Sequence, residues 1–168
     1  MKNELELFVE LWERENAKTT KLLQALPPDR YDFRPDPEAR SLGEMAWHLA
    51  EVEGYGTFGI ERGAISPEPK PPGITRPRTV PELSSGFERV HRDAVARVQK
   101  LRPEDLDRSL TFFNGQSARV RDVLWDFLLF HQIHHRGQLV VLCRAAGGVP
   151  PSMFGPTRET APLRKRSA

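Results

Sequence analysis

Apolar residues recur at helical spacing in four long stretches of the chain, which cover residues 3–26, 41–63, 79–102 and 117–146. Pairs with the spacing of a capping box open the first three stretches, and Ser117 can cap the fourth; the pairs are Asn3 with Glu6, Ser41 with Glu44, and Thr79 with Glu82. Proline or glycine follows each stretch, at Pro27-Pro28, Gly63, Pro103 and Gly147-Gly148. The pattern therefore predicts an all-α fold, a four-helix bundle.

The connections between these helices carry their own signals. Residues 66–81 contain six of the fifteen prolines, so we expect an extended crossover between the second and third helices. An Asn-Gly pair between Leu110 and Ser117 predicts a brief extended piece with a turn. Neither flank of the proline-rich stretch is long enough to be a separate domain. We therefore predict one domain over residues 1–168, in which residues 158–168 form a loose basic tail.

The last predicted helix concentrates the histidines of the chain. Three of the five lie within five residues, at His131, His134 and His135. At about 100° per residue, His131 and His135 share one apolar stripe with Leu124 and Leu142. Two unpaired imidazoles are costly to bury together, so a shared divalent metal ion explains the pair better than two separate core histidines do. His134, three residues after His131, offers a competing ligand pair.

A third ligand must come from another helix, and His48 is the natural candidate because it lies on the apolar stripe of the second helix. Taken alone, such a histidine is more often a core or interface residue than a ligand. Three neutral imidazoles leave coordination positions open to water or substrate, which is typical of a catalytic site and not of a structural one. His91 lies among charged residues, and we interpret it as an ordinary surface histidine.

Two residues near the histidines are candidates for catalytic roles. Glu51, one turn after His48, is the candidate general base, with Glu53 as a weaker second. Gln138 follows His135 on the same side and could hydrogen-bond a ligand. Arg136 points to another face, where we expect it to form a structural ion pair with a carboxylate.

Composition and charge narrow the class of protein. With 38% hydrophobic and 29% charged residues, the chain is typical of soluble globular proteins, and we expect neither a membrane-spanning segment nor a signal peptide. Cys143 is the only cysteine, so no internal disulfide can form, and we predict a cytoplasmic protein. The net charge of +2 comes partly from the tail, which carries no recognisable nucleic-acid motif, so we do not expect nucleic acid as a partner.

Several segments together resemble a known family. Phe33-Arg34-Pro35, residues 40–51, residues 131–138 and residues 148–156 match, in order and spacing, the DinB-like (DinB/YfiT-like) superfamily of metalloproteins. The resemblance implies a four-helix bundle with up-down-down-up connections. It also implies a divalent metal, often nickel or zinc, held by three histidines, which would be His48, His131 and His135.

The resemblance says less about the reaction. It implies a homodimer that packs helix against helix and a small-molecule substrate, and some similar proteins use a low-molecular-weight thiol such as bacillithiol or mycothiol as cosubstrate. The residues do not decide between a thiol-dependent S-transferase and a related hydrolase. The alternative is a non-catalytic, stress-related metal-binding or dimerisation protein.

Overall fold

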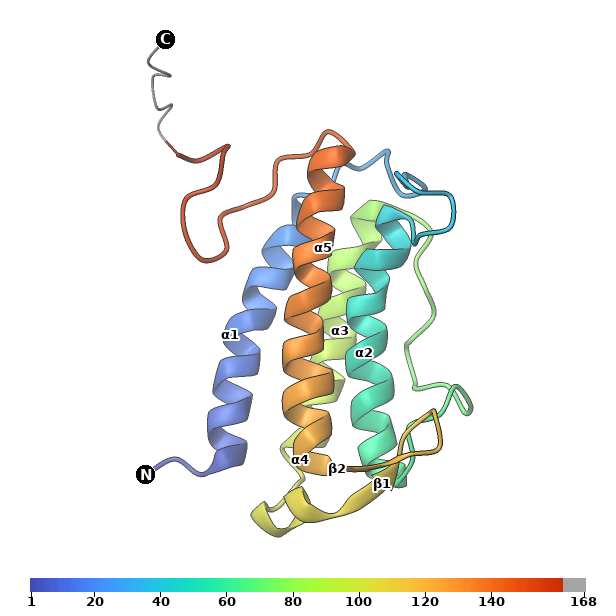
Figure 1. Ribbon diagram of the computed structural model, residues 1–168, viewed down its shortest axis with the longest axis vertical. Helices are drawn as coiled ribbons and strands as arrows, with labels where there is room; N and C mark the ends of the chain where they lie inside the picture. Colours follow the sequence, from blue (N-terminus) through green and yellow to red (C-terminus); the bar gives the residue numbers. More distant parts are fainter. Residues whose placement is uncertain (162–168) are drawn as a thin grey trace.

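The computed structural model describes residues 1–161 and contains four long helical segments side by side (Figure 1). These are α1 (Glu4–Gln24), α2 (Leu42–Arg62), α3 (Val80–Val98) and a final run composed of α4 (Val120–Asp122), η2 (Val123–Phe130) and α5 (His131–Ala145). The helix α1 and the final run point one way, whereas α2 and α3 both point the other way (Figure 1). The predicted four-helix bundle with up-down-down-up connections is therefore confirmed.

The predicted extended crossover joins the end of α2 to the beginning of α3 along the length of the bundle (Figure 1). Gly63 ends α2 in the left-handed conformation, with φ 81°. Two hydrogen bonds fix the far half of the crossover: the Trp47 indole donates to the Ile74 carbonyl (3.1 Å), and the Tyr31 hydroxyl donates to the Pro77 carbonyl (2.7 Å). The crossover is therefore tied to the bundle and gives α2 and α3 their parallel direction.

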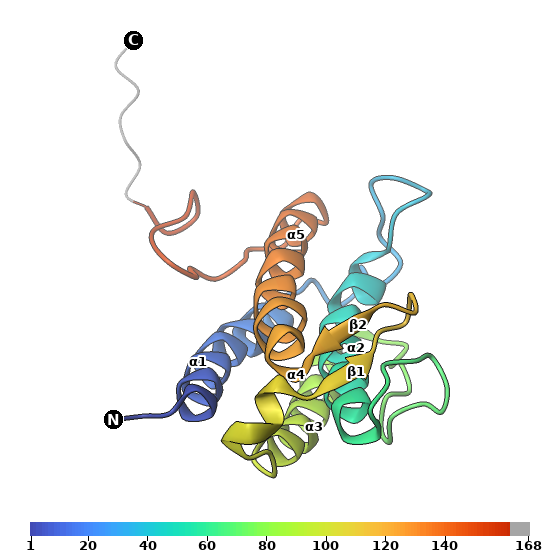
Figure 2. The same cartoon turned by 60° about the horizontal axis from the view of Figure 1, so that its bottom comes forward.

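A short 3₁₀ helix, η1 (Pro103–Asp107), and a two-stranded antiparallel hairpin precede the final helical run. The strands are β1 (Ser109–Thr111) and β2 (Ser117–Arg119), and the hairpin lies across the end of α2 (Figure 2). Backbone hydrogen bonds hold it there, since the Ile65 amide donates to the Thr111 carbonyl and the Thr111 amide donates to the Gly63 carbonyl. The extended piece predicted around the Asn-Gly turn is thus present.

The helix starts agree with the predictions only in part. Complete capping boxes open α1 at Asn3 and α2 at Ser41, as predicted. The prediction for Thr79 is wrong, because its hydroxyl bonds to the Glu82 side chain and caps no backbone amide. The prediction for Ser117 is also wrong: Ser117 pairs with Thr111 in the hairpin, and the helix begins three residues later.

The final run also differs from the uniform α-helix that its periodicity predicts. The segment η2 is a π-helix, whose hydrogen bonds reach one residue further than those of an α-helix. Its residues carry no helix-breaking signal, so sequence pattern alone could not reveal it. The π-helix ends directly before His131, and the α-helical spacing that relates His131 to His135 holds within α5.

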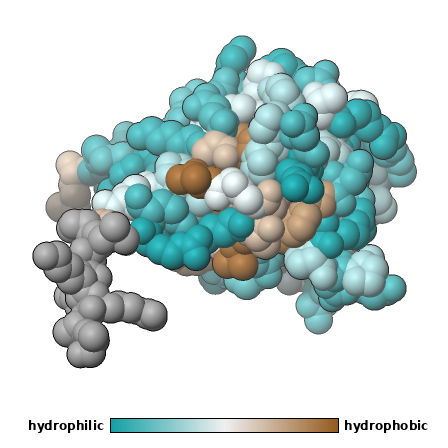
Figure 3. Space-filling view, turned by 90° about the horizontal axis from the view of Figure 1, so that it is seen from above, coloured by the Kyte–Doolittle hydropathy of each residue, from teal (hydrophilic) through white to brown (hydrophobic). Residues whose placement is uncertain are grey.

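The interior consists of two apolar clusters, one toward each end of the bundle, with buried polar residues between them along the helices. The buried polar and charged side chains include Glu15, Asn16, Thr19, Glu53, Gln132 and Arg136. Seen from above, the molecule is mainly hydrophilic, with a few hydrophobic residues near the middle of the view (Figure 3). Within residues 1–161, no helix has both the length and the apolar character needed to cross a membrane.

The extent of the domain and the nature of its tail stay predictions. The structure describes residues 158–161 of the predicted basic tail, and residues 162–168 lie outside the described part of the chain.

Candidate metal centre

Three histidines from two helices meet inside the bundle. His48 lies on α2, and His131 and His135 lie one turn apart on α5. Each of the three offers a ring nitrogen, and these nitrogens all lie within 4.8 Å of one another. The Nε2 atoms of His131 and His135 are 2.7 Å apart, and the His48 ring centroid is 4.7 Å from that of His135. The structure therefore brings together the three residues that the sequence singles out.

Close packing of α2 against the final run produces this meeting. At Gly56 on α2, an added Cβ atom would lie 2.5 Å from the Leu128 side chain, so a larger residue would force that side chain or the helices to shift. Phe127 on the final run stacks on the His131 ring, with centroids 5.2 Å apart and planes inclined by 21°. The lack of a side chain at Gly56 and the Phe127 ring thus help place the imidazoles.

The electrostatics of the cluster favour neutral rings. Burial, the largest cause, and the nearby imidazoles of His135, His48 and His134 together lower the pKa of His131 to about 4. Burial also lowers the pKa of His135, with His48, His134 and Arg40 contributing, although the Gln138 side chain opposes the shift. Neutral imidazoles each present a lone pair, which is the form that binds a metal ion.

The hydrogen-bond inventory tests whether these residues fit a metal ion. The Nε2 atoms of His131 and His135, which are 2.7 Å apart, can share only one proton. Among the described residues, no carboxylate belongs to the three-histidine group. No hydrogen bond of ordinary geometry reaches the buried Nδ1 atom of His131 from the described residues, although the Phe127 backbone weakly favours its protonated ring. A single cation would satisfy all three lone pairs, so the donor set fits zinc or nickel.

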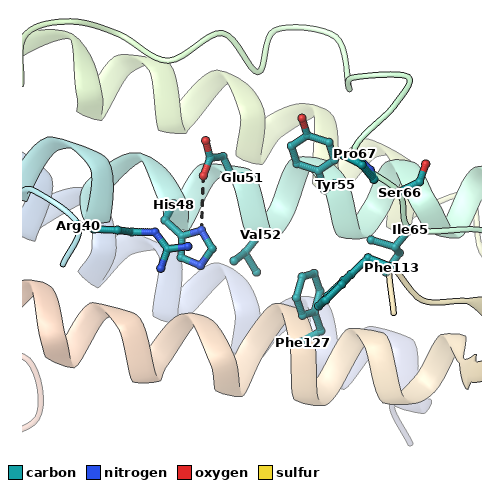
Figure 4. A pocket seen from close by; sticks show the side chains of 10 residues that line it. All are labelled: Arg40, His48, Glu51, Val52, Tyr55, Ile65, Ser66, Pro67, Phe113 and Phe127. Carbon is teal, nitrogen blue, oxygen red and sulfur yellow. Dashed lines mark hydrogen bonds and ion pairs between the residues drawn. The ribbon is translucent and has the colours of Figure 1, made fainter. Parts of the chain in front are cut away.

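Glu51 contacts the far side of the His48 ring. The His48 Nδ1–H group donates to a Glu51 carboxylate oxygen at 3.4 Å (Figure 4). Arg76 donates to the other oxygen at 3.3 Å. Burial alone would raise the pKa of Glu51, but the bonds from His48 and Arg76 outweigh burial and lower it. This geometry suits a residue that orients the ring, and its role as general base stays a prediction.

Gln138 has the corresponding place beside His135. The His135 Nδ1–H group donates to the Gln138 side-chain oxygen at 2.7 Å, which directs the ring's Nε2 atom toward His131. The Gln138 amide nitrogen donates to His134 at 3.2 Å. His134 is exposed and does not join the three-histidine group, so the structure offers no support for the competing His131/His134 pair.

The interpretation of His91 as a surface residue is wrong. Its side chain is only 13% exposed, and its two ring nitrogens lie 2.9 Å from a Glu53 oxygen and 3.1 Å from a Glu13 oxygen. Burial would lower the pKa of His91, but the charge of Glu53 and the hydrogen bonds to both carboxylates outweigh burial and raise it. The sequence signal that indicates a buried position is its spacing, four residues after Phe87 and three before Ala94, both of which are buried.

Glu53, the weaker candidate for a general base near the metal, bonds to other residues instead. Its fully buried carboxylate accepts hydrogen bonds from Trp12 (3.1 Å), Gln132 (2.6 Å) and His91, none of which belongs to the three-histidine group. Arg136, by contrast, behaves as expected: it is buried and forms an ion pair with Glu15 on α1. The last helix thus directs His131 and His135 to one side, and on a neighbouring face Gln132 and Arg136 bind buried carboxylates.

A pocket of about 530 Å³ adjoins the histidine cluster (Figure 4). Polar groups, including His48 and Glu51, line one part of it, and apolar and aromatic side chains line the rest. Its lining residues are Arg40, His48, Glu51, Val52, Tyr55, Ile65, Ser66, Pro67, Phe113 and Phe127. The pocket gives a small molecule a route to the candidate metal centre.

Comparisons with known proteins agree on one family. The family model for the DinB superfamily matches residues 11–139. The uncharacterized protein YrdA of Bacillus subtilis (strain 168) is 31% identical over 158 residues, which cover 92% of this chain and 90% of YrdA. The uncharacterized protein YjoA of the same organism is 25% identical over 130 residues, covering 77% of this chain and 82% of YjoA.

Solved structures with the same fold come from the same genus. A DinB-like protein from Bacillus cereus ATCC 10987 superposes with a TM-score of 0.71 at 26% identity, over 88% of this chain and 95% of that one. The DinB-like protein YjoA from Bacillus subtilis gives a TM-score of 0.72 at 23% identity, over 88% and 96% of the two chains. This second likeness supports the fold alone.

Proposed function

The chain belongs to the DinB superfamily, whose members commonly bind metals, and from this premise we propose that it is a metal-dependent enzyme acting on a small molecule. In this proposal His48, His131 and His135 bind one divalent ion, zinc or nickel. The observation that carries it is the convergence of three imidazoles whose ligand nitrogens lie within 4.8 Å of one another. No carboxylate among the described residues belongs to that group, so a cation is its natural partner.

The surrounding residues support a catalytic use of this centre. A divalent ion bound by three imidazoles would supply Lewis acidity next to the pocket. Glu51 and Gln138 hold the far nitrogens of His48 and His135, which fixes the orientation of both rings. Glu51 also lines the pocket, so it can accept a proton from a bound substrate and serve as the general base.

We favour thiol-dependent S-transfer, with related hydrolysis as the second reaction of the same centre. A zinc ion suits a soft thiolate ligand. The chain's own thiol is not available for this role, because Cys143 is fully buried and burial raises the pKa of its thiol. The thiol would therefore come from a low-molecular-weight cosubstrate that enters the pocket.

Metal removal and restoration test the proposal. Chelator-treated protein should lose turnover on a panel that combines low-molecular-weight thiols with electrophiles, and on a parallel panel of esters and amides. Zinc or nickel should restore the turnover, whereas metal-supplemented His135→Ala protein should remain inactive. Strong stabilisation of folding by metal with no turnover on either panel would overturn the enzymatic proposal and favour the non-catalytic alternative.

The surface of the final helix supports a second proposal, that of a homodimer. Phe130 and Val141 are 56% and 64% exposed and lie about three helical turns apart on one face, with Gly137 between them. Light scattering should give a dimer mass for the native chain and a monomer mass for Val141→Glu. A monomeric native chain would overturn the proposal. The cytoplasmic location stays a prediction.

A further inference from the structure

Arg40 lies at the rim of the pocket, in the connection just before α2. Its side chain extends toward the His48 ring (Figure 4), and it lines the pocket. The neighbouring arginines, Arg34 and Arg76, both pair with Glu44. Arg40 is exposed, and it forms no ion pair with any residue in the described range 1–161.

Arg40 places a positive charge beside a cluster that would bind a cation. Its charge repels a metal ion at the cluster, and the one carboxylate at the pocket, Glu51, already pairs with Arg76 and His48. The local charge is therefore positive when a metal is bound. An anion between Arg40 and the cluster would relieve this repulsion, and a guanidinium binds a carboxylate through two parallel hydrogen bonds.

The rest of the pocket is mainly apolar, with Ser66 as the exception. Val52 and Tyr55 come from α2, Phe127 comes from the final helical run, and Phe113 comes from the hairpin turn. Figure 4 shows Arg40 at one end of the pocket and the two phenylalanines toward the other end. Phe113 is 65% exposed, so its ring can cover a bound molecule at little cost in packing.

We infer that the pocket binds a small organic carboxylate with an aromatic or branched apolar body. The carboxylate pairs with Arg40, and the body lies against Tyr55, Phe113 and Phe127. This inference rests on the proposed function, since the same molecule would be the one presented to the metal centre, but it names the substrate class that the metal ligands alone do not specify. It makes Arg40 a specificity-determining residue.

Isothermal titration calorimetry of zinc-loaded protein tests whether Arg40 binds a carboxylate. The probes are 3-phenylpropionate and its uncharged analogue 3-phenylpropionamide, which have nearly the same shape. The native chain should bind the carboxylate roughly fivefold more tightly than the amide, as expected for a partly exposed ion pair. Arg40→Gln should remove this preference. Arg78→Gln, which changes an exposed arginine outside the pocket, should keep it.

A second pair of ligands tests whether the pocket binds an apolar body. The native chain should bind 3-phenylpropionate several-fold more tightly than acetate, because the phenyl ring buries apolar surface. Phe113→Ala should reduce that difference, whereas Phe154→Ala, at an exposed phenylalanine outside the pocket, should not. Equal binding of acetate and 3-phenylpropionate by the native chain would contradict the apolar part.

The zinc content of each sample separates this inference from the proposed function. If the native chain holds zinc but binds the carboxylate and the amide equally, the inference is wrong and the metal centre stands. A carboxylate preference that persists in Arg40→Gln also overturns the inference, because the metal and not the arginine would then bind the anion. If the native chain holds no zinc, the metal proposal is wrong, and titration of the same sample still tests Arg40.

Discussion

Half-buried histidines occur at two places in the bundle, and their ring nitrogens have opposite kinds of partner. One place is His91 with its carboxylates, and the other is the three-histidine group. His91 lies between two carboxylates, Glu53 and Glu13, and its pKa is raised. His131 and His135 lie against each other and against His48, and the pKa values of both are lowered. Both ring nitrogens of His91 face carboxylates, whereas the converging nitrogens of His48, His131 and His135 face one another, and the Glu51 carboxylate contacts the far nitrogen of His48.

The difference separates a histidine that stabilises the fold from one that can bind a metal ion. A buried ring with a carboxylate on each nitrogen is complete without any ligand. A group of neutral rings remains incomplete until a cation joins it. Burial and helical position do not distinguish the two cases, because the histidines of both groups face the interior. The partners of the ring nitrogens distinguish them.

Removal of one ring from the three-histidine group should have the largest effect. We expect His131→Ala or His135→Ala to lower the affinity for zinc by roughly a hundredfold or more, since two imidazoles remain where three converge. Equilibrium dialysis with metal analysis measures this. The control is His134→Ala, because this exposed neighbour does not belong to the group. Native zinc affinity in both of the first two variants would refute the site.

Removal of the His91 side chain should lower the stability of the fold and leave metal binding unchanged. His91→Ala leaves the fully buried Glu53 carboxylate without its positive partner, so the free energy of unfolding should fall by about 3 kcal/mol. Urea denaturation gives this value, and the folded variant should still bind one zinc ion per chain. If metal were lost while the fold and its stability remained, His91 would belong to the metal centre, and the contrast between the two groups would fail.

The residues that orient the metal ligands should have smaller effects. Glu51→Gln weakens the hydrogen bond to the His48 ring, and we expect about a tenfold loss of zinc affinity. Glu61→Gln is the matched control, because Glu61 lies on the same helix but pairs with Arg97 and Lys100. An equal loss in both variants would show a general effect of charge and not an effect on ring orientation.

In metal-free protein, the two groups should respond to acid in opposite directions. The pKa of His131 is about 4 in the folded state and about 6.5 in the unfolded chain, so its contribution to stability is present above pH 6.5 and is lost as the pH falls toward 4. The raised pKa of His91 means that its contribution is complete below about 6.5 and is lost as the pH rises through the folded value.

Urea denaturation of the metal-free chain across this range measures both trends. On acidification, the stability advantage of the native chain over His91→Gln should grow, and its advantage over His131→Gln should shrink. Parallel trends in the two variants would contradict the difference that we draw between the two groups.

The sequence predicts features that depend on local periodicity and spacing. The four helices, the capping boxes at Asn3 and Ser41, and the proline-rich crossover follow from positions close together in the chain. The pairing of His131 and His135 on one helix face follows from their spacing of four, and the choice of His48 follows from its place on an apolar stripe.

What the sequence misses depends on contacts between distant segments. The His91–Glu53 pair forms only when α3 packs against α2, and its neighbour Glu13 comes from α1. Ser117 fails as a cap because it pairs with Thr111 in a hairpin, and the π-helix before His131 leaves no mark in the residue pattern. Local patterns identify the candidates, and only the packed structure shows which partners each ring has.

Anomalous diffraction at the zinc and nickel absorption edges, on crystals of untreated protein, tests the central claim most directly. We predict one peak within about 2.0–2.1 Å of an imidazole nitrogen from each of His48, His131 and His135. A strong peak bound elsewhere, or no peak at this cluster in crystals grown with added zinc, would contradict it.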